Sequence, residues 1–497
     1  MKISSFFKGL LFAAFFCVFC FAQESKTVPR FEQADCAVPV PKGENAECGY
    51  LVVKEKRVAK NDKTIRLPII ILRAENPDSK NEPVLRTLGG PGASSLRMVG
   101  SRPRAPWLKN RDLIIFEQRG TKYAQPALDC AEVSAANIAS AKKQFAAKAA
   151  RADEIKAAKA CFDRLTAQGI DLSAYNSAES AADIEDLRRA LKLEKINLWG
   201  VSYSARLMLN VMRDYPQGIR SVVLESTMPP EINYDEVGVD GIVSALNQLF
   251  NNCKADSECL AAYPNLENEF YETVAKLNKE PVIANVKDAK SGASFDVKLN
   301  GDDFATWIID YLLSDSAEAI VDAPLVIHAT FEGTYAAFKR YANDKISPSN
   351  YSLGMRYSFW CSEEIPFESR PKIAAQSNVY PRLKGYEVMS LPEICGVWKV
   401  SAAKPWENSA VKSDIPTFVV AAEYDAYTPP AWGKATTKNL KNSFFVEIPW
   451  AGHGPAFSTP CLRDLIAAFF DNPKQVPNSS ECVEKVRRQF KFVVKKT

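Results

Sequence analysis

The chain has 497 residues, of which 46% are hydrophobic, and its formal net charge is +4. This length suffices for one large domain with an insertion or for two domains, and the hydrophobic fraction suffices for a substantial core. A charge so close to neutral gives no reason to expect nucleic acid as a partner.

The first residues, Met1–Ala22, have the pattern of a secretory signal peptide. Two lysines give a positive start, Gly9–Phe21 is almost wholly apolar, and a small-residue cleavage site ends at Ala22. A membrane anchor is the alternative, but the apolar stretch has about 13 residues whereas a span needs about 20. Lipidation of Cys17 or Cys20 is a further alternative. We expect a cleaved leader, a periplasmic or secreted protein, and no stable membrane insertion.

Ten cysteines follow this leader and fall into sequential pairs. In an oxidising compartment, five local disulfides are the simplest interpretation. The pairs are Cys36 with Cys48, Cys130 with Cys161, Cys253 with Cys259, Cys361 with Cys395, and Cys461 with Cys482. A zinc site is the alternative, and it is disfavoured because this part of the sequence has no CxxC and the chain has only two histidines. We expect no metal and no cofactor.

Short apolar segments rich in β-branched residues alternate with helical patterns. The predicted strands are Tyr50–Lys56, Thr64–Leu72, Pro83–Leu88, Asp112–Phe116, Lys195–Trp199, Ser221–Glu225, Pro416–Ala422 and Ser443–Ile448. Helices are predicted between several of them, including Ala178–Leu193 and Ala205–Asp214. This alternation predicts an α/β fold with a mostly parallel central sheet flanked by helices.

Two segments interrupt the alternation. Ala135–Gln168 is rich in alanine and lysine and is typical of a solvent-facing helix. The longer interruption, residues 228–414, has helical patterns, its own cysteines and many aromatic residues. We predict a core domain of residues 23–227 and 415–497, and a large, mainly α-helical cap domain of residues 228–414 inserted after the sixth core strand.

The pentapeptide GVSYS, residues 200–204, lies between a predicted strand and a predicted helix. A serine at the tip of such a turn is exposed at the end of the sheet, where a substrate carbonyl can reach it, and the motif G-x-S-x-G forms this nucleophile elbow. Here Ser204 replaces the last glycine, which keeps the side chain small. An ordinary loop is the alternative, but we predict Ser202 as the nucleophile, which needs a nearby base.

The two histidines, His328 and His453, are the candidates for that base. His328 lies within a helical pattern of the predicted cap and is expected to be structural. His453 follows the last predicted core strand between two glycines, in the segment AGHGP. Such a loop can project an imidazole over the end of the sheet, so we predict His453 as the general base.

The acid that orients His453 is expected in the loop after the preceding strand, where Asp425 lies. The order Ser202, Asp425, His453 is found in one large class of serine hydrolases. Glu423, which is nearer the strand, and Glu225, at the end of an earlier strand, remain alternatives.

An acyl-transfer site also needs backbone N–H groups that stabilise the developing oxyanion. The N–H of Tyr203, directly after the nucleophile, is one candidate. The other is expected in the glycine-rich loop TLGGPG, residues 87–92, because glycines let the backbone approach a substrate. We predict the N–H of Gly90, with Gly89 as the alternative.

Five motifs taken together resemble a known family. They are Leu88–Gly92, Glu117–Thr121, Gly200–Ser204, Tyr424-Asp425 with Thr428–Pro430, and Ala451–Gly454. In combination they are similar to the prolyl and tripeptidyl aminopeptidases of the α/β-hydrolase superfamily, and the region of Cys461 and Cys482 is similar to the TAP-like C-terminal region of exported members. The resemblance covers residues 36–483. The sequence departs from the family pattern at Ser204, at Thr87-Leu88 and at Lys122, none of which removes a catalytic atom.

The resemblance implies a serine exopeptidase that releases N-terminal residues, of proline or tripeptide type, from peptides with a free N-terminus. Family members hold the free amine with acidic side chains under the cap. At the matching stretch this implies Glu363 and Glu364 as substrate-binding residues. An exported carboxylester hydrolase with the same triad is the alternative, since one fold supports both chemistries. A non-catalytic binding protein is disfavoured by the intact serine, aspartate and histidine.

Overall fold

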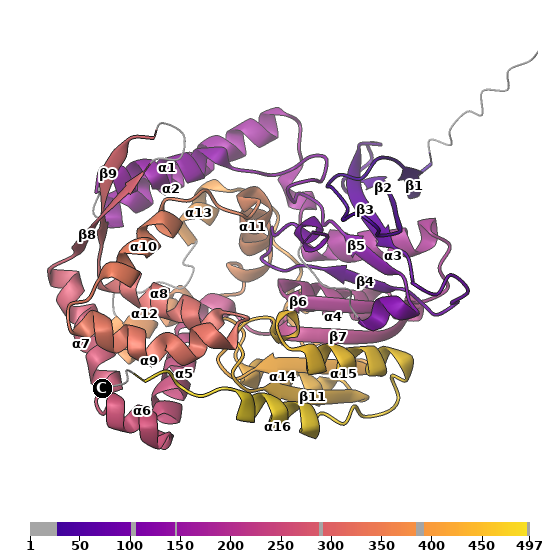
Figure 1. The fold of residues 1–497 in the computed structure, drawn as a ribbon. Coiled ribbons are helices and arrows are strands. Elements are labelled where there is room, and N and C mark those ends of the chain that lie inside the picture. Colours follow the sequence, from indigo (N-terminus) through magenta and orange to yellow (C-terminus); the bar gives the residue numbers. More distant parts are fainter. Residues whose placement is uncertain (1–26, 101–105, 145–146, 288–291, 384–391, 495–497) are drawn as a thin grey trace, which may run out of the picture.

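The computed structural model describes residues 27–100, 106–144, 147–287, 292–383 and 392–494 (Figure 1). The signal peptide expected at residues 1–22 lies outside these ranges. Within them, no helix is both long enough and apolar enough to cross a membrane.

A nine-stranded sheet forms the core, in the order β1-β2-β3-β5-β4-β6-β7-β10-β11. The strands from β5 to β11 run parallel to one another, and β1, β2 and β3 pair antiparallel at one edge. Their bounds are β1 Arg30–Gln33, β2 Ala46–Lys54, β3 Thr64–Leu72, β4 Val84–Thr87, β5 Leu113–Phe116, β6 Ile196–Ser202, β7 Ile219–Thr227, β10 Thr417–Ala422 and β11 Ser443–Ile448. The α/β fold class expected from the sequence is confirmed.

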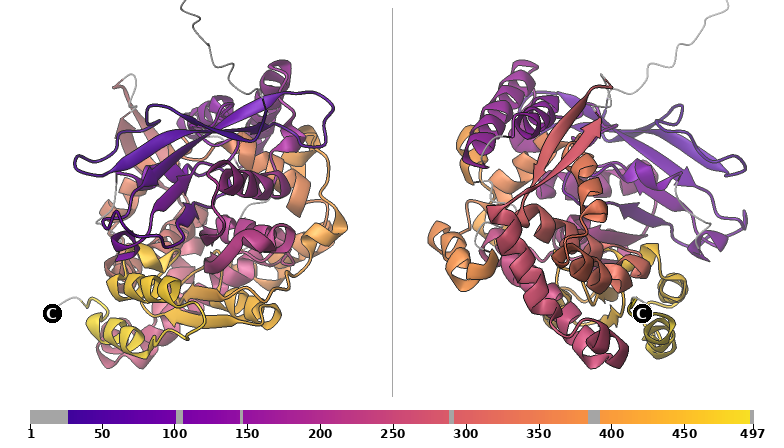
Figure 2. Two further views of the ribbon diagram at one scale, coloured as in Figure 1. Left: turned by 90° about the vertical axis from the view of Figure 1, so that its right-hand side faces the viewer. Right: turned by 60° about the vertical axis from the view of Figure 1, so that its left-hand side comes forward.

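Helices cover both faces of this sheet because successive strand residues point to opposite sides (Figure 2). Leu198 and Val222 pack under one layer, whereas their neighbours Trp199 and Val223 pack under the other. The first layer contains α3 Ser177–Ala190, α4 Tyr203–Asp214 and α14 Pro430–Thr436. The second layer contains α15 Pro460–Asp471 and α16 Ser480–Gln489.

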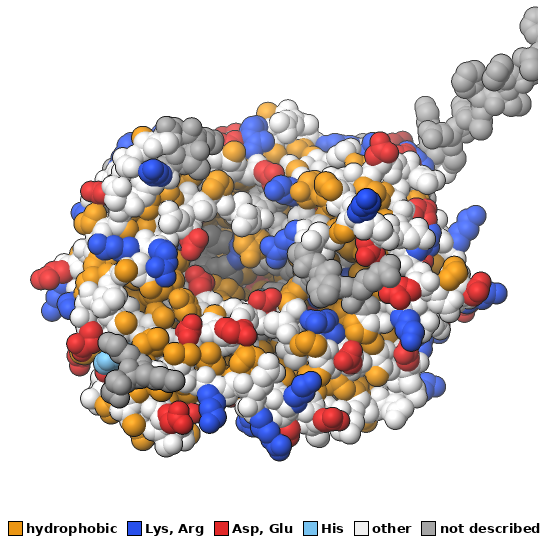
Figure 3. Space-filling model, in the orientation of Figure 1, with side chains coloured by type: hydrophobic (Ala, Val, Ile, Leu, Met, Phe, Trp, Pro, Cys, Tyr) orange, Lys and Arg blue, Asp and Glu red, His pale blue; other side chains and the backbone are white. Residues whose placement is uncertain are grey.

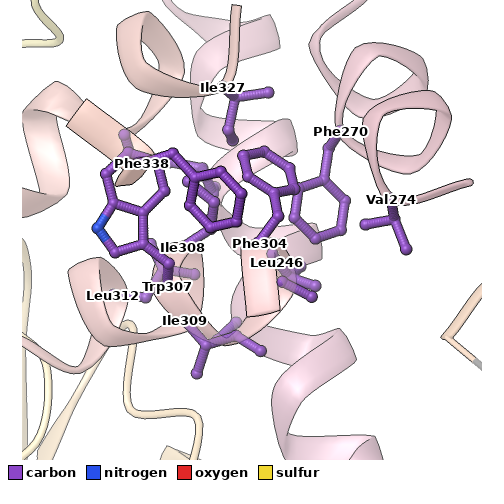
Figure 4. Packing of buried hydrophobic residues seen from close by; sticks show 14 of the residues in the cluster. Leu246, Phe270, Val274, Phe304, Trp307, Ile308, Ile309, Leu312, Ile327 and Phe338 are labelled. Atoms are coloured by element: carbon purple, nitrogen blue, oxygen red, sulfur yellow. The ribbon is translucent and has the colours of Figure 1, made fainter. Parts of the chain in front are cut away.

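The insertion between β7 and β10, called the cap below, is mainly helical, as expected. It contains α5 Tyr234–Ala255, α6 Ser257–Ala262, α7 Leu266–Lys279, α8 Gly301–Leu313, α9 Ala317–Phe331, α10 Ala336–Lys345, α11 Leu353–Phe359, α12 Arg370–Val379 and α13 Pro392–Val397. Its own core is aromatic: Phe270, Phe304, Trp307 and Phe338 pack together (Figure 4).

Two features of the cap differ from the sequence expectation. A hairpin, β8 Val282–Lys287 with β9 Ser294–Leu299, interrupts the helices, and the alternation of polar and apolar residues in Ser294–Leu299 is the signal that the helical interpretation overlooked. The cap also follows the seventh strand rather than the sixth, because the short edge strand β1 was not predicted.

The predicted helix at residues 135–168 consists of two helices, α1 Ala131–Lys142 and α2 Ala147–Ala167. The expectation assigned this segment to the core domain. In the structure α1 packs against β9 and α2 packs against α13, so both contact the insertion (Figure 1). We therefore propose that the cap is built from two chain segments, residues 131–167 and 228–414.

All five disulfides join the sequential neighbours predicted from the sequence. Cys130–Cys161 connects α2 to the residue before α1, and Cys361–Cys395 connects the π-helix Trp360–Glu364 to α13. Five disulfides are typical of a protein that matures in an oxidising compartment.

Candidate active site

Ser202 lies at a sharp turn between β6 and α4. Its backbone has φ = 62°, a conformation that is strained for a residue with a side chain. A Cβ atom on Gly200 would lie 2.3 Å from the carbonyl oxygen of Ser204, so this turn requires glycine there. The geometry is that of a nucleophile elbow, as GVSYS predicts.

Ser204, which occupies the usual glycine position, stabilises the turn. Its Oγ accepts a hydrogen bond from the N–H of Val201 at 2.8 Å and lies 2.8 Å from the carbonyl oxygen of Thr87, to which it donates. Thr87 ends β4, so this side chain joins the elbow to the strand that leads into the glycine-rich loop. The departure from glycine therefore leaves the elbow intact.

His453 and Asp425 form a hydrogen-bonded pair at the carboxyl edge of the sheet. The Nδ1 atom of His453 lies 3.0 Å from Oδ1 and 2.9 Å from Oδ2 of Asp425. Since Nδ1 faces the carboxylate, the neutral tautomer assigned from this partner carries its proton on Nδ1 and leaves Nε2 as a base. The side chain of His453 is 21% exposed, whereas that of Asp425 is fully buried.

The loop after β10 holds the Asp425 carboxylate as an anion. Thr428 Oγ1 donates to Oδ2 at 2.7 Å, and the N–H groups of Tyr427 and Thr428 donate to Oδ1 at 3.1 and 2.9 Å. Burial alone would raise the pKa of Asp425, but His453 and the two donors of Thr428 together lower it below its usual value. Burial would likewise lower the pKa of His453, but the charge and hydrogen bond of Asp425, with the charge of Glu225, raise it overall.

The two alternative acids have other partners. Glu423 accepts hydrogen bonds from the side-chain amides of Gln248 and Asn252 and from the N–H of Trp450. Glu225 accepts from the indole N–H of Trp199 at 2.9 Å and from the N–H of Ala456 at 2.7 Å. Of the three carboxylates, only Asp425 is hydrogen-bonded to the imidazole.

The backbone candidates for an oxyanion hole lie beside the elbow. Tyr203 is the first residue of α4, and the first N–H groups of a helix have no partner within the helix. The glycine-rich loop is packed against it, because a Cβ on Gly89 would lie 2.7 Å from Cβ of Ser202 and 2.9 Å from the nitrogen of Tyr203. The next residue, Gly90, has φ = 112°.

Ser202, His453, Gly89 and Gly90 line one cavity of about 700 Å³ between core and cap. A hollow with acidic and basic side chains around it is visible on this side of the molecule (Figure 3). Other residues of the cap and the loops also line the cavity. They are aromatic (Tyr234, Trp360 and Tyr427), acidic (Asp310 and Asp315) or basic (Arg97 and Arg356). The cavity therefore has apolar walls and charges of both signs.

The structure does not bring Glu363 and Glu364 to this cavity. Both are buried, at 3% and 1% exposure, on the π-helix behind Trp360. Glu364 is ion-paired with Arg206 of α4 and accepts from the N–H of Tyr234, while Glu363 accepts from the N–H of Ser177 at 2.6 Å. Burial raises the pKa of Glu363 to about 7, against the opposing effect of Arg206.

Sequence reasoning overlooked two cavity residues that carry a recognisable signal. Asp310 is the single charged residue in the apolar helical stretch WIIDYLL, and Arg356 is the single charged residue in LGMRYSFW. Charged residues are seldom buried without a partner, so a charged residue in such an apolar stretch indicates an ion pair or a binding site. Partial desolvation, with the charge of Asp344, raises the pKa of Asp310 to about 6. The residue nevertheless remains exposed to solvent.

His328 lies in α9, in the cap, as expected. Its Nδ1 is 3.0 Å from Oε2 of Glu269, and its ring packs beside Tyr263. No group of three or more His, Cys, Asp or Glu side chains in the described ranges is arranged to hold a metal ion. The metal-free and cofactor-free reaction expected from the sequence stays a prediction.

Two family models match the chain. One, described as alpha/beta hydrolase fold, matches residues 102–260, which include the elbow. The chain has the α/β-hydrolase fold. A second model, described as TAP-like protein, matches residues 382–482. The resemblance inferred from the sequence motifs is confirmed.

The chain is similar to a tripeptidyl aminopeptidase of Streptomyces lividans, with 23% identity over 472 residues that cover 88% of this chain and 83% of the relative. It is also similar to the serine protease Hip1 of Mycobacterium bovis, with 21% identity over 439 residues that cover 79% of each chain. A solved esterase of Thermogutta terrifontis aligns with 85% of this chain and 99% of its own at 16% identity and a TM-score of 0.36.

Proposed function

We propose that this α/β-hydrolase is an exported serine exopeptidase that releases N-terminal residues, of proline or tripeptide type, from peptides. The observation that carries the proposal is the hydrogen-bonded pair of Asp425 and His453 at a cavity that Ser202 also lines. The similarity to relatives named tripeptidyl aminopeptidase and serine protease supports peptide substrates.

In the proposed reaction, Ser202 Oγ attacks the scissile carbonyl carbon while its proton passes to Nε2 of His453. The N–H groups of Gly90 and Tyr203 stabilise the oxyanion of the tetrahedral intermediate. The C–N bond then breaks, and the leaving amine takes the proton from His453. Water then attacks the acyl-enzyme while His453 takes its proton. The ester bond to Ser202 breaks, the acyl product is released, and His453 returns the proton to Ser202 Oγ. Asp425 keeps the imidazole in the reactive tautomer throughout.

Asp310 and Asp315 replace Glu363 and Glu364 in our proposal for binding the free amine. Both line the Ser202 cavity, and neither carboxylate has an ion-pair partner among the described residues. Glu363 and Glu364 are buried and already have partners: Glu364 is ion-paired with Arg206, and Glu363 accepts a hydrogen bond from a backbone N–H. A substrate ammonium would form a charge-assisted hydrogen bond with a cavity carboxylate and neutralise it.

Export is part of the proposal. The five disulfides support maturation in an oxidising compartment, and residues 1–22 have the sequence of a cleaved leader. N-terminal sequencing of the protein recovered from periplasmic and medium fractions of an expressing bacterium tests this. A chain that begins at Gln23 supports export with cleavage, and an intact Met1 in the cytosolic fraction contradicts it.

The decisive experiment is a release assay on the purified protein, with Ser202→Ala as the control. The panel contains Pro-, Ala- and Ala-Ala-Pro-linked chromogenic amides, their N-acetylated counterparts, and a short-chain ester. Cleavage of free-amine amides, lost on acetylation and in Ser202→Ala, supports the exopeptidase, and the released fragment shows one residue or three. Turnover of the ester alone contradicts the peptidase and leaves the carboxylester hydrolase.

A further inference from the structure

One segment of the cap contacts both residues whose backbone N–H groups are proposed for the oxyanion hole. This segment, residues 351–364, consists of α11 with its preceding turn and the π-helix, and α11 lies on the side of the cap that faces the sheet (Figure 1). The guanidinium Nη1 of Arg356 donates a hydrogen bond to the carbonyl oxygen of Gly90 at 2.9 Å. The ring of Phe359 packs edge-on against Tyr203, with ring centroids 4.7 Å apart.

The orientation of Gly90 is held from both sides of the residue. The carbonyl oxygen of Gly89 accepts from the N–H of Ala93 at 3.3 Å. In a trans peptide the next N–H points the opposite way, so this contact directs the N–H of Gly90 away from the turn. The carbonyl of Gly90 is held by Arg356. A glycine at positive φ has wide conformational freedom, and the second contact restricts it.

Arg356 is itself fixed by aromatic neighbours. Its guanidinium carbon lies 5.1 Å from the ring centroid of Trp360 and 5.4 Å from that of Tyr351, within the range of cation–π attraction. The cap also attaches to the loop beside it, because the N–H of Ser352 donates to the carbonyl of Gly92 at 2.9 Å. The guanidinium is therefore held in one place relative to the glycine-rich loop.

We propose that Arg356 is a positioning residue that completes the oxyanion hole from the cap: it holds the carbonyl of Gly90 and so restricts the backbone of the residue whose N–H is the proposed donor. The inference rests on the proposed function in two points, Ser202 as the nucleophile and the N–H of Gly90 as an oxyanion donor, and it holds equally for a peptide or an ester substrate. The competing role is direct contact with substrate, since Arg356 lines the cavity. The two roles differ in what they do to a small reagent that has no peptide chain.

The test compares Arg356→Met, Arg356→Lys and the matched control Arg382→Met. Arg382 is a cap arginine that also lies over an aromatic ring, that of Tyr271, at 3.6 Å, and it is not among the cavity-lining residues. For each variant we measure kcat and KM on the best substrate, the rate at which a small fluorophosphonate modifies Ser202 with loss of fluoride, and the melting temperature. Arg356→Met is also assayed with added guanidinium at concentrations below its unfolding transition.

The expected result is a fall of about 10- to 100-fold in both kcat and the fluorophosphonate rate for Arg356→Met, because a displaced oxyanion donor loses transition-state stabilisation. KM stays nearly unchanged. The rates of Arg356→Lys are intermediate, guanidinium restores part of the rate of Arg356→Met, and Arg382→Met behaves as the wild type.

The inference is overturned if the fluorophosphonate rate of folded Arg356→Met is within about threefold of the wild type. Should that variant not fold, the same criterion applies to Arg356→Lys. A wild-type protein that reacts with the fluorophosphonate but cleaves no amide contradicts the peptidase and leaves this test valid.

Discussion

Nδ1 of His453 lies 2.9 Å from Oδ2 and 3.0 Å from Oδ1 of Asp425, so one edge of the imidazole faces both oxygens of a buried carboxylate. The carboxylate receives three further hydrogen bonds from the loop that carries it. A buried anion with this many donors stays ionised, and it can stabilise the imidazolium that forms when Ser202 is deprotonated.

Replacing this carboxylate with an amide is expected to abolish most of the activity. In Asp425→Asn, kcat falls by about 10³- to 10⁴-fold, because the amide no longer holds the reactive tautomer or the imidazolium. Steady-state kinetics on the best substrate measures the loss. Glu423→Gln is the matched control, since Glu423 bonds to Gln248, Asn252 and Trp450 rather than to the imidazole. An equal loss in both variants would contradict the assignment of the acid.

The pH dependence of the reaction follows from the raised pKa of His453. The base must be neutral to accept the serine proton, so the reaction rate rises with pH through the pKa of His453. Asp425, with a smaller contribution from Glu225, outweighs burial and places that pKa above its usual value of 6.5. The acid limb of fluorophosphonate inactivation is therefore expected to have its midpoint above pH 6.5.

This reagent has no amine, so its profile reports the free enzyme without titration of the substrate. In Asp425→Asn the supporting charge is removed, and the midpoint moves to lower pH. A wild-type midpoint at or below 6.5, or an unchanged midpoint in the variant, would show that Asp425 does not control the base.

The sequence predicts those parts of the site that depend on local chain geometry. The elbow, the histidine loop and the acid loop each follow a strand directly, and the carboxyl ends of parallel strands meet at one edge of a sheet. Recognising the strands was therefore enough to bring Ser202, Asp425 and His453 together. Two predicted strands, Thr64–Leu72 and Ser443–Ile448, have the observed bounds, and each is mostly apolar.

The cap side of the cavity depends instead on contacts between residues far apart in the chain. Glu364 is paired with Arg206, 158 residues away, and Arg356 with the carbonyl of Gly90, 266 residues away. A carboxylate in an aromatic stretch is equally compatible with a ligand site and a buried ion pair. Only the packing of the insertion on the core distinguishes the two, and here Glu364 is ion-paired with Arg206, for which we predict a structural role.

This structural role predicts a stability effect for Glu364→Gln. Arg206 and Glu364 are both almost fully buried, so removing one charge leaves the other without its compensation. The free energy of unfolding is expected to fall by about 3 kcal/mol, which is the lower end of the range for a broken buried ion pair. The loss is at this end because Glu363 also lies near the guanidinium and still compensates part of its charge. Chemical denaturation at constant slope measures the change.

Asp414→Asn is the control for that measurement, since its ion pair with Lys441 is exposed to solvent. Exposed pairs contribute little, so the midpoint of denaturation is expected to stay that of the wild type. A Glu364→Gln protein of unchanged stability that instead loses affinity for free-amine substrates would return Glu364 to the role that the family resemblance implied.

The amine-binding proposal predicts a selective effect of Asp310→Asn. Loss of a charge-assisted hydrogen bond of about 1.5–3 kcal/mol lowers kcat/KM for free-amine amides by about 10- to 100-fold. The fluorophosphonate rate is expected to stay unchanged, because that reagent presents no ammonium. Asp322→Asn, on helix α9 and not among the cavity-lining residues, is the matched control. Asp315→Asn and the double variant divide the effect between the two cavity carboxylates. If the double variant keeps the full preference for free-amine over acetylated substrates, the ammonium is held elsewhere in the cavity and the assignment is wrong.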